Sequence, residues 1–158
     1  MKIVILGAGR IGGSLARNLS NSNYEVCVVD ENKNRLSELE DRLDIMTVEG
    51  SASHLKTLKK SNLDKESIIL AVTSNDEVNI VACQIAKKFF HVKKTICRFK
   101  DNSYFENLDI FGEGVIDIPI SPEDEITTHL KELIDHPGAN QIESFANGKV
   151  KLVSVKAK

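Results

Sequence analysis

The sequence predicts an α/β fold built on a doubly wound parallel sheet of six strands, in the order 3-2-1-4-5-6. An apolar run at residues 3–6 leads directly into Gly7-Ala8-Gly9-Arg10-Ile11-Gly12, the G-x-G-x-x-G pattern of a dinucleotide-binding turn. Apolar runs then alternate with helix-like segments along most of the chain, and such strands must be parallel with right-handed crossovers. These observations indicate a Rossmann-like domain, whose ligand crevice lies where the strand order reverses.

The three glycines of the motif have separate structural purposes. Gly7 lets the chain turn sharply off the first strand, and Gly9 lets backbone N–H groups close on a pyrophosphate. Gly12 lets the following amphipathic helix pack against that strand. The N-terminus of this helix faces the anion with its partial positive charge.

An acidic residue follows the second strand at the spacing that the motif requires. Residues 25–29 form a buried-strand pattern that ends at Asp30, eighteen residues after Gly12. A carboxylate there accepts hydrogen bonds from a ribose diol, and its charge disfavours a 2′-phosphate. The fingerprint therefore favours NAD(H) or an adenine nucleotide over NADP. The simpler alternative for Asp30 is a solvated aspartate that opens a turn.

The other elements follow from hydrophobic spacing and turn residues. Ser53 is the expected N-cap of a short helix that carries Leu55 and Leu58. The expected strands span residues 3–6, 25–29, 45–48, 67–72, 94–99 and 114–118. Further helices are expected at residues 32–43, 78–90, 103–111 and 123–134.

Polar residues leave the fourth and fifth strands at the same edge of the sheet. Thr73 and Ser74 should face the glycine turn across the crevice between the first and fourth strands. Arg98, at the end of the fifth strand, would add a cation near this rim. Capping of the next helix is a compatible function for Thr73 and Ser74, and a surface salt bridge is an equal alternative for Arg98.

The pattern changes after the sixth strand. Pro119 and Pro122 break regular structure before the helix at 123–134, and Pro137-Gly138 stops that helix. Two alternating segments then flank Asn147-Gly148, a strong hairpin signal. We expect a nucleotide-binding domain at 1–120, a crossover helix and linker at 121–140, and the start of a truncated C-terminal subdomain at 141–158.

Composition argues against several classes of partner. The 158 residues carry a formal net charge of −2, so a basic face for nucleic acid is not expected. No run approaches the ~18 apolar residues of a membrane span, so we expect no direct membrane insertion. Cys27, Cys83 and Cys97 lie far apart in apolar segments, which is typical of reduced core thiols in a cytoplasmic protein.

Catalytic patterns are missing from the sequence. The Tyr-x-x-x-Lys dyad fails at Tyr24 and Tyr104, and the four histidines have no paired acid or metal-ligand spacing. We therefore expect no catalytic residue and no metal site. Nucleotide binding without catalytic groups indicates a sensor rather than an enzyme.

Several longer stretches are distinctive beyond the glycine motif: GAGRIGGSLA, VVDEN with Arg35, VEGSASH, LAVTSNDEVNIVACQIAKKF, ICRF, ISPE and HPGANQIESFANGKVKLVSVKA. Together they resemble the N-terminal half of the TrkA family, the cytosolic regulatory subunits of Trk-type potassium uptake built from RCK (regulator of potassium conductance) domains. Members usually carry two such halves in tandem, so the resemblance implies a fragment or an excised domain.

The resemblance implies that NAD(H), or ATP or ADP, binds at the glycine turn. Ser51 follows Gly50 where many RCK domains place Asp, on the adenine side of the site. Arg10 would supply a cation beside the phosphates, and Arg98 would close the rim. The implied ligand-binding residues are Gly7, Ala8, Gly9, Arg10, Ile11, Gly12, Asp30, Ser51, Thr73, Ser74 and Arg98.

The resemblance also implies partners. The helix at 123–134 resembles the crossover helix of the family, which mediates dimer contacts, so a homodimer or a higher ring is expected. The ligand would gate a membrane potassium transporter allosterically, and that partner would hold the protein at the inner face of the cell membrane. Two other classes stay open: a fragment of an NAD-dependent oxidoreductase that lacks its catalytic domain, and an S-adenosylmethionine-dependent methyltransferase.

Overall fold

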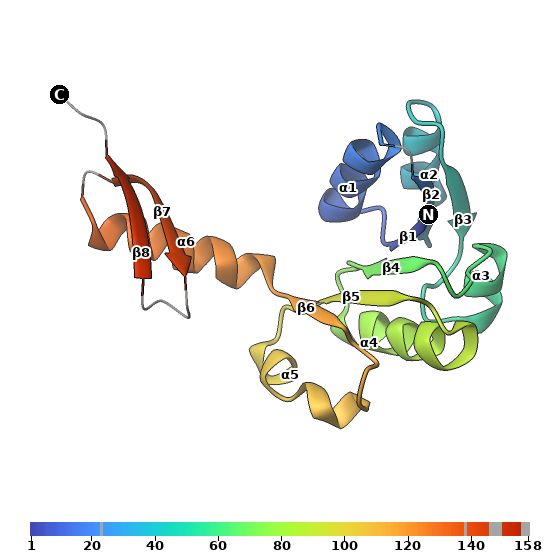
Figure 1. Cartoon of the computed structure of the whole chain (residues 1–158). Coiled ribbons are helices and arrows are strands. Elements are labelled where there is room, and N and C mark those ends of the chain that lie inside the picture. Colours follow the sequence, from blue (N-terminus) through green and yellow to red (C-terminus); the bar gives the residue numbers. More distant parts are fainter. Residues whose placement is uncertain (23, 138, 146–149, 156–158) are drawn as a thin grey trace. The chain divides into compact units, whose positions relative to one another are not determined.

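Six parallel strands form the sheet of the N-terminal unit in the order β3-β2-β1-β4-β5-β6, which confirms the predicted fold class (Figure 1). The computed structural model describes residues 1–22, 24–137, 139–145 and 150–155. They fall into two units, Met1–Ile120 and Ser121–Lys158. The strands of the first unit are β1 (Lys2–Leu6), β2 (Glu25–Asp30), β3 (Met46–Glu49), β4 (Ile68–Ala71), β5 (Lys94–Arg98) and β6 (Ile118–Ile120).

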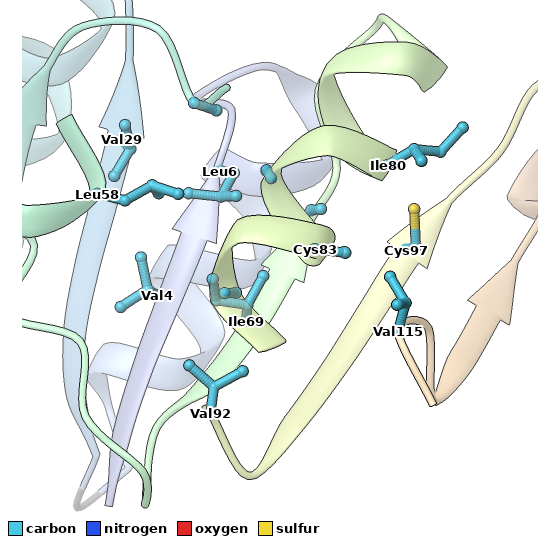
Figure 2. Close-up of a cluster of buried hydrophobic side chains, with 14 of the residues drawn as sticks. Val4, Leu6, Val29, Leu58, Ile69, Ile80, Cys83, Val92, Cys97 and Val115 are labelled. Carbon is cyan, nitrogen blue, oxygen red and sulfur yellow. The ribbon is translucent and has the colours of Figure 1, made fainter. Parts of the chain in front are cut away.

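Helices cover both faces of this sheet, and the side chains of each strand alternate between two hydrophobic clusters. Val4 and Leu6 of β1 lie in the cluster under α3 (Leu55–Lys60) and α4 (Asp76–Ile85), as Figure 2 shows. Ile3 and Ile5 lie in the other cluster, under α1 (Arg10–Ser20) and α2 (Lys33–Glu40). All three cysteines are buried and free, as expected. With both faces covered, the edge at the carboxyl ends of the strands is left for a ligand.

The sixth strand lies further along the chain than predicted, so the expectation at 114–118 is wrong. β6 pairs with β5 in the register Ile96↔Ile118, Cys97↔Pro119. Proline lacks an N–H, but at the edge of a sheet that donor is not needed. Val115 instead buries its side chain in the core, and its carbonyl accepts a 2.7 Å hydrogen bond from the Thr95 hydroxyl.

Three helix predictions also need correction. His54, rather than Ser53, is the N-cap of α3, and the Ser53 hydroxyl lies 3.2 Å from that of Ser51. The helix predicted at 78–90 begins earlier, at Asp76, because Asn75 caps it by accepting from the Val78 N–H at 2.8 Å. Its last turn is a π-helical segment, η1 (Ala86–Phe90). The segment predicted as one helix at 103–111 consists of α5 (Asn102–Glu106) and the 3-10 turn η2 (Leu108–Phe111).

The second unit contains one helix and one pair of antiparallel strands in its described part. α6 (Pro122–Asp135) matches the helix predicted there, and β7 (Ala139–Phe145) pairs antiparallel with β8 (Val150–Val155). The predicted Asn147-Gly148 turn lies outside the described residues. Among the residues described, no helix combines the length and the apolar character needed to cross a bilayer.

Candidate functional site

The glycine turn brings β1, α1 and β4 into direct backbone contact. Gly7 has a φ of +103°, and a Cβ placed there would lie 3.0 Å from the Thr73 Cα. A Cβ on Gly12 would lie 1.7 Å from the Gly7 carbonyl oxygen. Packing therefore requires glycine at both positions.

Gly9 differs from the other two glycines, because no contact among the described residues requires it. Its φ of −70° suits any residue, and a Cβ there would meet no atom within 4 Å. Gly9 is also the N-cap of α1, and no side chain caps this helix end. The exposed Arg10 follows as the first helical residue. The turn therefore leaves open space beside uncapped N–H groups, which is the local chemistry of an anion site.

Asp30 fastens the second strand to the glycine turn. Its Oδ2 accepts from the Ala8 N–H at 2.6 Å, and its Oδ1 accepts from the Asn32 N–H at 2.8 Å. The Arg35 guanidinium lies 4.0 Å from Oδ1 and is half-exposed. An ionised carboxylate has about four acceptor positions, so two remain for other donors. Asp30 is thus held in place and can still accept from a ligand.

Thr73 packs against the glycine turn at Gly7, and the fully buried side chain of Asn79 holds it there. The Asn79 Oδ1 accepts from the Thr73 N–H at 3.0 Å and lies 2.7 Å from the Thr73 hydroxyl. The Asn79 amide group donates to the Arg98 carbonyl at 3.0 Å and contacts the Thr73 carbonyl at 3.3 Å. One amide therefore joins the ends of β4 and β5.

Arg98 and Ser74 occupy different depths at this edge. Arg98 is buried rather than at the surface, and its Nη1 donates to the Thr73 carbonyl at 2.9 Å. Ser74 is exposed, and its carbonyl accepts from the Lys100 ammonium at 2.7 Å. Ser51 follows β3 and is half-buried. At the end of β2, Asp30 pairs with Glu49 of β3, and Ser51 lies two residues after Glu49.

The structure brings the glycine turn together with Asp30 on one side and Thr73 on the other, and it adds a residue that the sequence prediction missed. That residue is Asn79, whose side chain is the only polar one described on α4 with no solvent exposure. The signal that could have revealed it is an amide side chain inside the apolar run VNIVAC. No group of three or more His, Cys, Asp or Glu among the described residues could hold a metal ion. Burial raises the pKa of the Cys27 thiol to about 11, so this thiol is a poor nucleophile.

Comparison with protein families finds one match over most of the chain. The TrkA-N domain family matches residues 3–122. The Trk system potassium uptake protein TrkA of Halomonas elongata is 44 % identical over 99 % of this chain and 35 % of its own length. TrkA of Vibrio alginolyticus is 42 % identical over 99 % of this chain and 35 % of its own length. The chain thus spans about a third of the length of these relatives.

Solved structures share the fold at lower sequence identity. The TrkA-N domain of the inner membrane protein ybaL from Escherichia coli has a TM-score of 0.71 at 21 % identity, over 84 % of this chain and 96 % of that one. The GsuK channel bound to NAD has a TM-score of 0.63 at 22 % identity, over 79 % of this chain and 22 % of that one. GsuK bound to ADP has a TM-score of 0.61 at 21 % identity, over 76 % of this chain and 31 % of that one.

Proposed function

The chain belongs to the TrkA-N domain family, and we propose that it binds NAD(H), or ATP or ADP, in order to regulate a Trk-type potassium transporter. The observation that carries the proposal is the open space at Gly9, between two glycines that packing requires. A side chain at position 9 would fill the space that a phosphate needs beside the N-terminus of α1.

The phosphates would lie against the turn formed by Gly7, Ala8, Gly9, Arg10 and Ile11, with Gly12 keeping α1 close to β1. The donors would be the N–H groups of Gly9, Arg10 and Ile11, because those of Gly7 and Ala8 already donate to the Val29 carbonyl and to Asp30. The Arg10 side chain is exposed beside this turn and would pair with a phosphate. Uncapped N–H groups at the end of a helix favour an anion both by hydrogen bonding and through the helix dipole.

The ribose of the adenosine would donate to the free acceptor positions of Asp30. The carboxylate already points along the glycine turn, since it holds the Ala8 N–H. A 2′-phosphate at the same place would be repelled by this charge, so NADP should bind less well than NAD(H). Ser51 would lie on the adenine side.

Thr73 and Ser74 would face the central part of the ligand. The Thr73 hydroxyl is directed toward Asn75 and Asn79, so Thr73 would contact a ligand mainly through its backbone and methyl group. The buried Arg98 donates to the Thr73 carbonyl, and its positive charge would favour an anionic ligand without direct contact. These contacts fit NAD(H) and ATP equally well, and the reported NAD- and ADP-bound states of GsuK agree with both.

Regulation requires a ligand that binds one arrangement of an assembly more tightly than another. α6 offers a surface for such an assembly. Ile126, Leu130 and Ile134 are each more than half exposed and recur at intervals of four residues, so they form one apolar stripe. We propose that the α6 stripe of a second copy packs here, and that the ligand alters the angle between copies. The transporter would respond to this change.

The proposal is tested by isothermal titration calorimetry with NADH, NAD⁺, ATP, ADP and S-adenosylmethionine. We expect binding of the first four compounds, and a loss of about fivefold in affinity in Arg10→Ala, since an exposed ion pair contributes about 1 kcal/mol. Arg17→Ala, in the last turn of the same helix, is the matched control and should bind normally. Binding of S-adenosylmethionine alone, or steady oxidation of NADH by added carbonyl compounds, would contradict the proposal.

A further inference from the structure

Six exposed lysines gather where β4 and β5 begin, at the edge opposite the candidate nucleotide site. They come from the end of α3, the loop before β4, η1, the loop before β5 and the first residue of β5: Lys59, Lys60, Lys65, Lys88, Lys93 and Lys94. We call this set the lysine patch. Asp64 and Glu66 are the acids within the same segments, so the formal charge here is about +4, although the chain as a whole carries −2.

Contacts between the two segments make the patch one surface. The Lys59 ammonium lies 5.1 Å from the centre of the Phe89 ring, which joins α3 to η1. The Lys93 N–H donates to the Ser67 carbonyl at 3.0 Å, which joins the two loops. Figure 1 shows α3 beside the end of the α4 segment on the same side of the sheet. The segments that carry these lysines are therefore neighbours in space, although about thirty residues separate Lys59 from Phe89 in the sequence.

Phe89 gives the patch an apolar centre. Its side chain is 51 % exposed and meets the Phe90 ring edge-on at 5.0 Å. Lys88 precedes it, and Lys59 lies over its face. A half-exposed aromatic ring with a lysine over its face, on segments rich in exposed lysines, is the pattern of a side chain that enters the headgroup layer of a membrane, while the ammonium groups stay among the phosphates.

We propose that the lysine patch binds an anionic phospholipid surface, with Phe89 in the headgroup layer. A lysine near such a surface contributes about fivefold in affinity, so four net charges favour anionic over neutral lipid by several hundredfold, on the order of 5⁴. The choice of lipid over protein rests on the proposed function, because the cytoplasmic loops of a membrane transporter carry Lys and Arg and would repel the patch. The nucleotide edge would face away from the bilayer, so both sites can be filled together.

The test is co-sedimentation of the full chain with vesicles of phosphatidylcholine alone, or of equal parts phosphatidylcholine and phosphatidylglycerol. We expect binding to the anionic vesicles only, and a decline as salt rises. Lys59→Glu/Lys88→Glu should weaken binding by at least about 30-fold, and Phe89→Ser should weaken it severalfold. Arg17→Glu/Arg42→Glu makes the same change of net charge at exposed positions of α1 and the turn after α2, and should bind normally.

Equal binding to both vesicle types, no binding to either, or an equal loss in the control variant would overturn the inference. Binding to polyglutamate without binding to anionic vesicles would also overturn it and would favour an acidic protein partner. A titration with NADH separates this inference from the proposed function. A chain that binds vesicles but no NADH would contradict the proposed function alone, and the reverse result would contradict only the lipid site.

Discussion

The carboxylate of Asp30 accepts a hydrogen bond from the backbone N–H of Ala8 at 2.6 Å, so the acid that ends β2 also holds the turn that follows β1. A second bond from the Asn32 N–H fixes the other carboxylate oxygen. The proposed ribose contact therefore requires no rearrangement of Asp30. Stability and ligand affinity should both depend on this one side chain.

Replacing Asp30 with Asn should test that dependence. The variant keeps the shape of the side chain but places an NH₂ group against one of the two backbone donors. We expect the free energy of unfolding to fall by about 1–2 kcal/mol, and affinity for NADH to fall roughly 10- to 100-fold through loss of charge-assisted bonds. Urea denaturation and calorimetry measure the two effects. Asp109→Asn, at an exposed position of η2, should change neither, and unaltered affinity in Asp30→Asn would exclude the ribose contact.

The contrast between Gly9 and Gly12 predicts opposite effects of the same substitution. Gly9→Ala should leave the free energy of unfolding within about 0.5 kcal/mol, because open space surrounds the new methyl group, while nucleotide affinity falls at least about tenfold. Gly12→Ala should cost about 3 kcal/mol or more, because its methyl group would overlap the Gly7 carbonyl. Thermal unfolding and calorimetry on the two variants check this. Full nucleotide affinity in Gly9→Ala would contradict the phosphate site.

Asn79→Ala should destabilise the fold by about 3 kcal/mol, because the part-buried Thr73 N–H and the buried Arg98 carbonyl would each lose a partner. Nucleotide affinity should fall as well, since Thr73 would lose its support. Asn18→Ala, at an exposed position of α1, is the control and should stay within about 0.5 kcal/mol. A wild-type unfolding midpoint in Asn79→Ala would show that the hydrogen bonds of Asn79 contribute nothing to stability.

Asp117 should make stability depend on pH. Burial acts to raise the pKa of this carboxyl, but hydrogen bonds from Lys87 and Thr95 and the charge of Lys87 outweigh it, and the pKa lies below its usual value. A depressed pKa means that the ionised form stabilises the fold above about pH 4, and that this contribution is lost as pH falls through the folded value. Asp117→Asn should therefore be less stable than the wild type at neutral pH.

Denaturation of both proteins between neutral pH and about pH 3 measures that difference, which should shrink as Asp117 becomes protonated. Glu113→Gln, nearby and exposed, should show no such trend. A difference between Asp117→Asn and the wild type that does not vary with pH would contradict the assignment.

The α6 stripe should support self-association. Leu130→Lys places a charge in the proposed contact and should weaken dimers roughly 10- to 100-fold, in line with the 1.5–3 kcal/mol gained by burying a leucine. Lys131→Glu changes the charge of the next, exposed position and should leave association intact. Light scattering coupled to size-exclusion chromatography measures both, and a monomeric wild-type chain would refute the proposed contact.

The order of the strands, the glycine turn and the position of Asp30 followed from the sequence, because each depends on local patterns and on the connectivity of parallel strands. Ser53 and the sixth strand were predicted wrongly for reasons that lie outside those patterns. Pro119 is acceptable only because β6 is an edge strand, and the N-cap of α3 depends on how the loop after Gly50 closes on Ser51.

Asn79, the burial of Arg98 and the lysine patch could not be predicted in this way. The partners of Asn79 come from the ends of β4 and β5, and Lys59 meets Phe89 thirty residues further along the chain. Net charge sums all residues regardless of position, so a value of −2 conceals a surface of about +4. A pattern of residue types specifies which elements form and in what order they pair. Which buried polar groups satisfy one another, and which like charges end up side by side, depends on contacts that exist once the elements have packed.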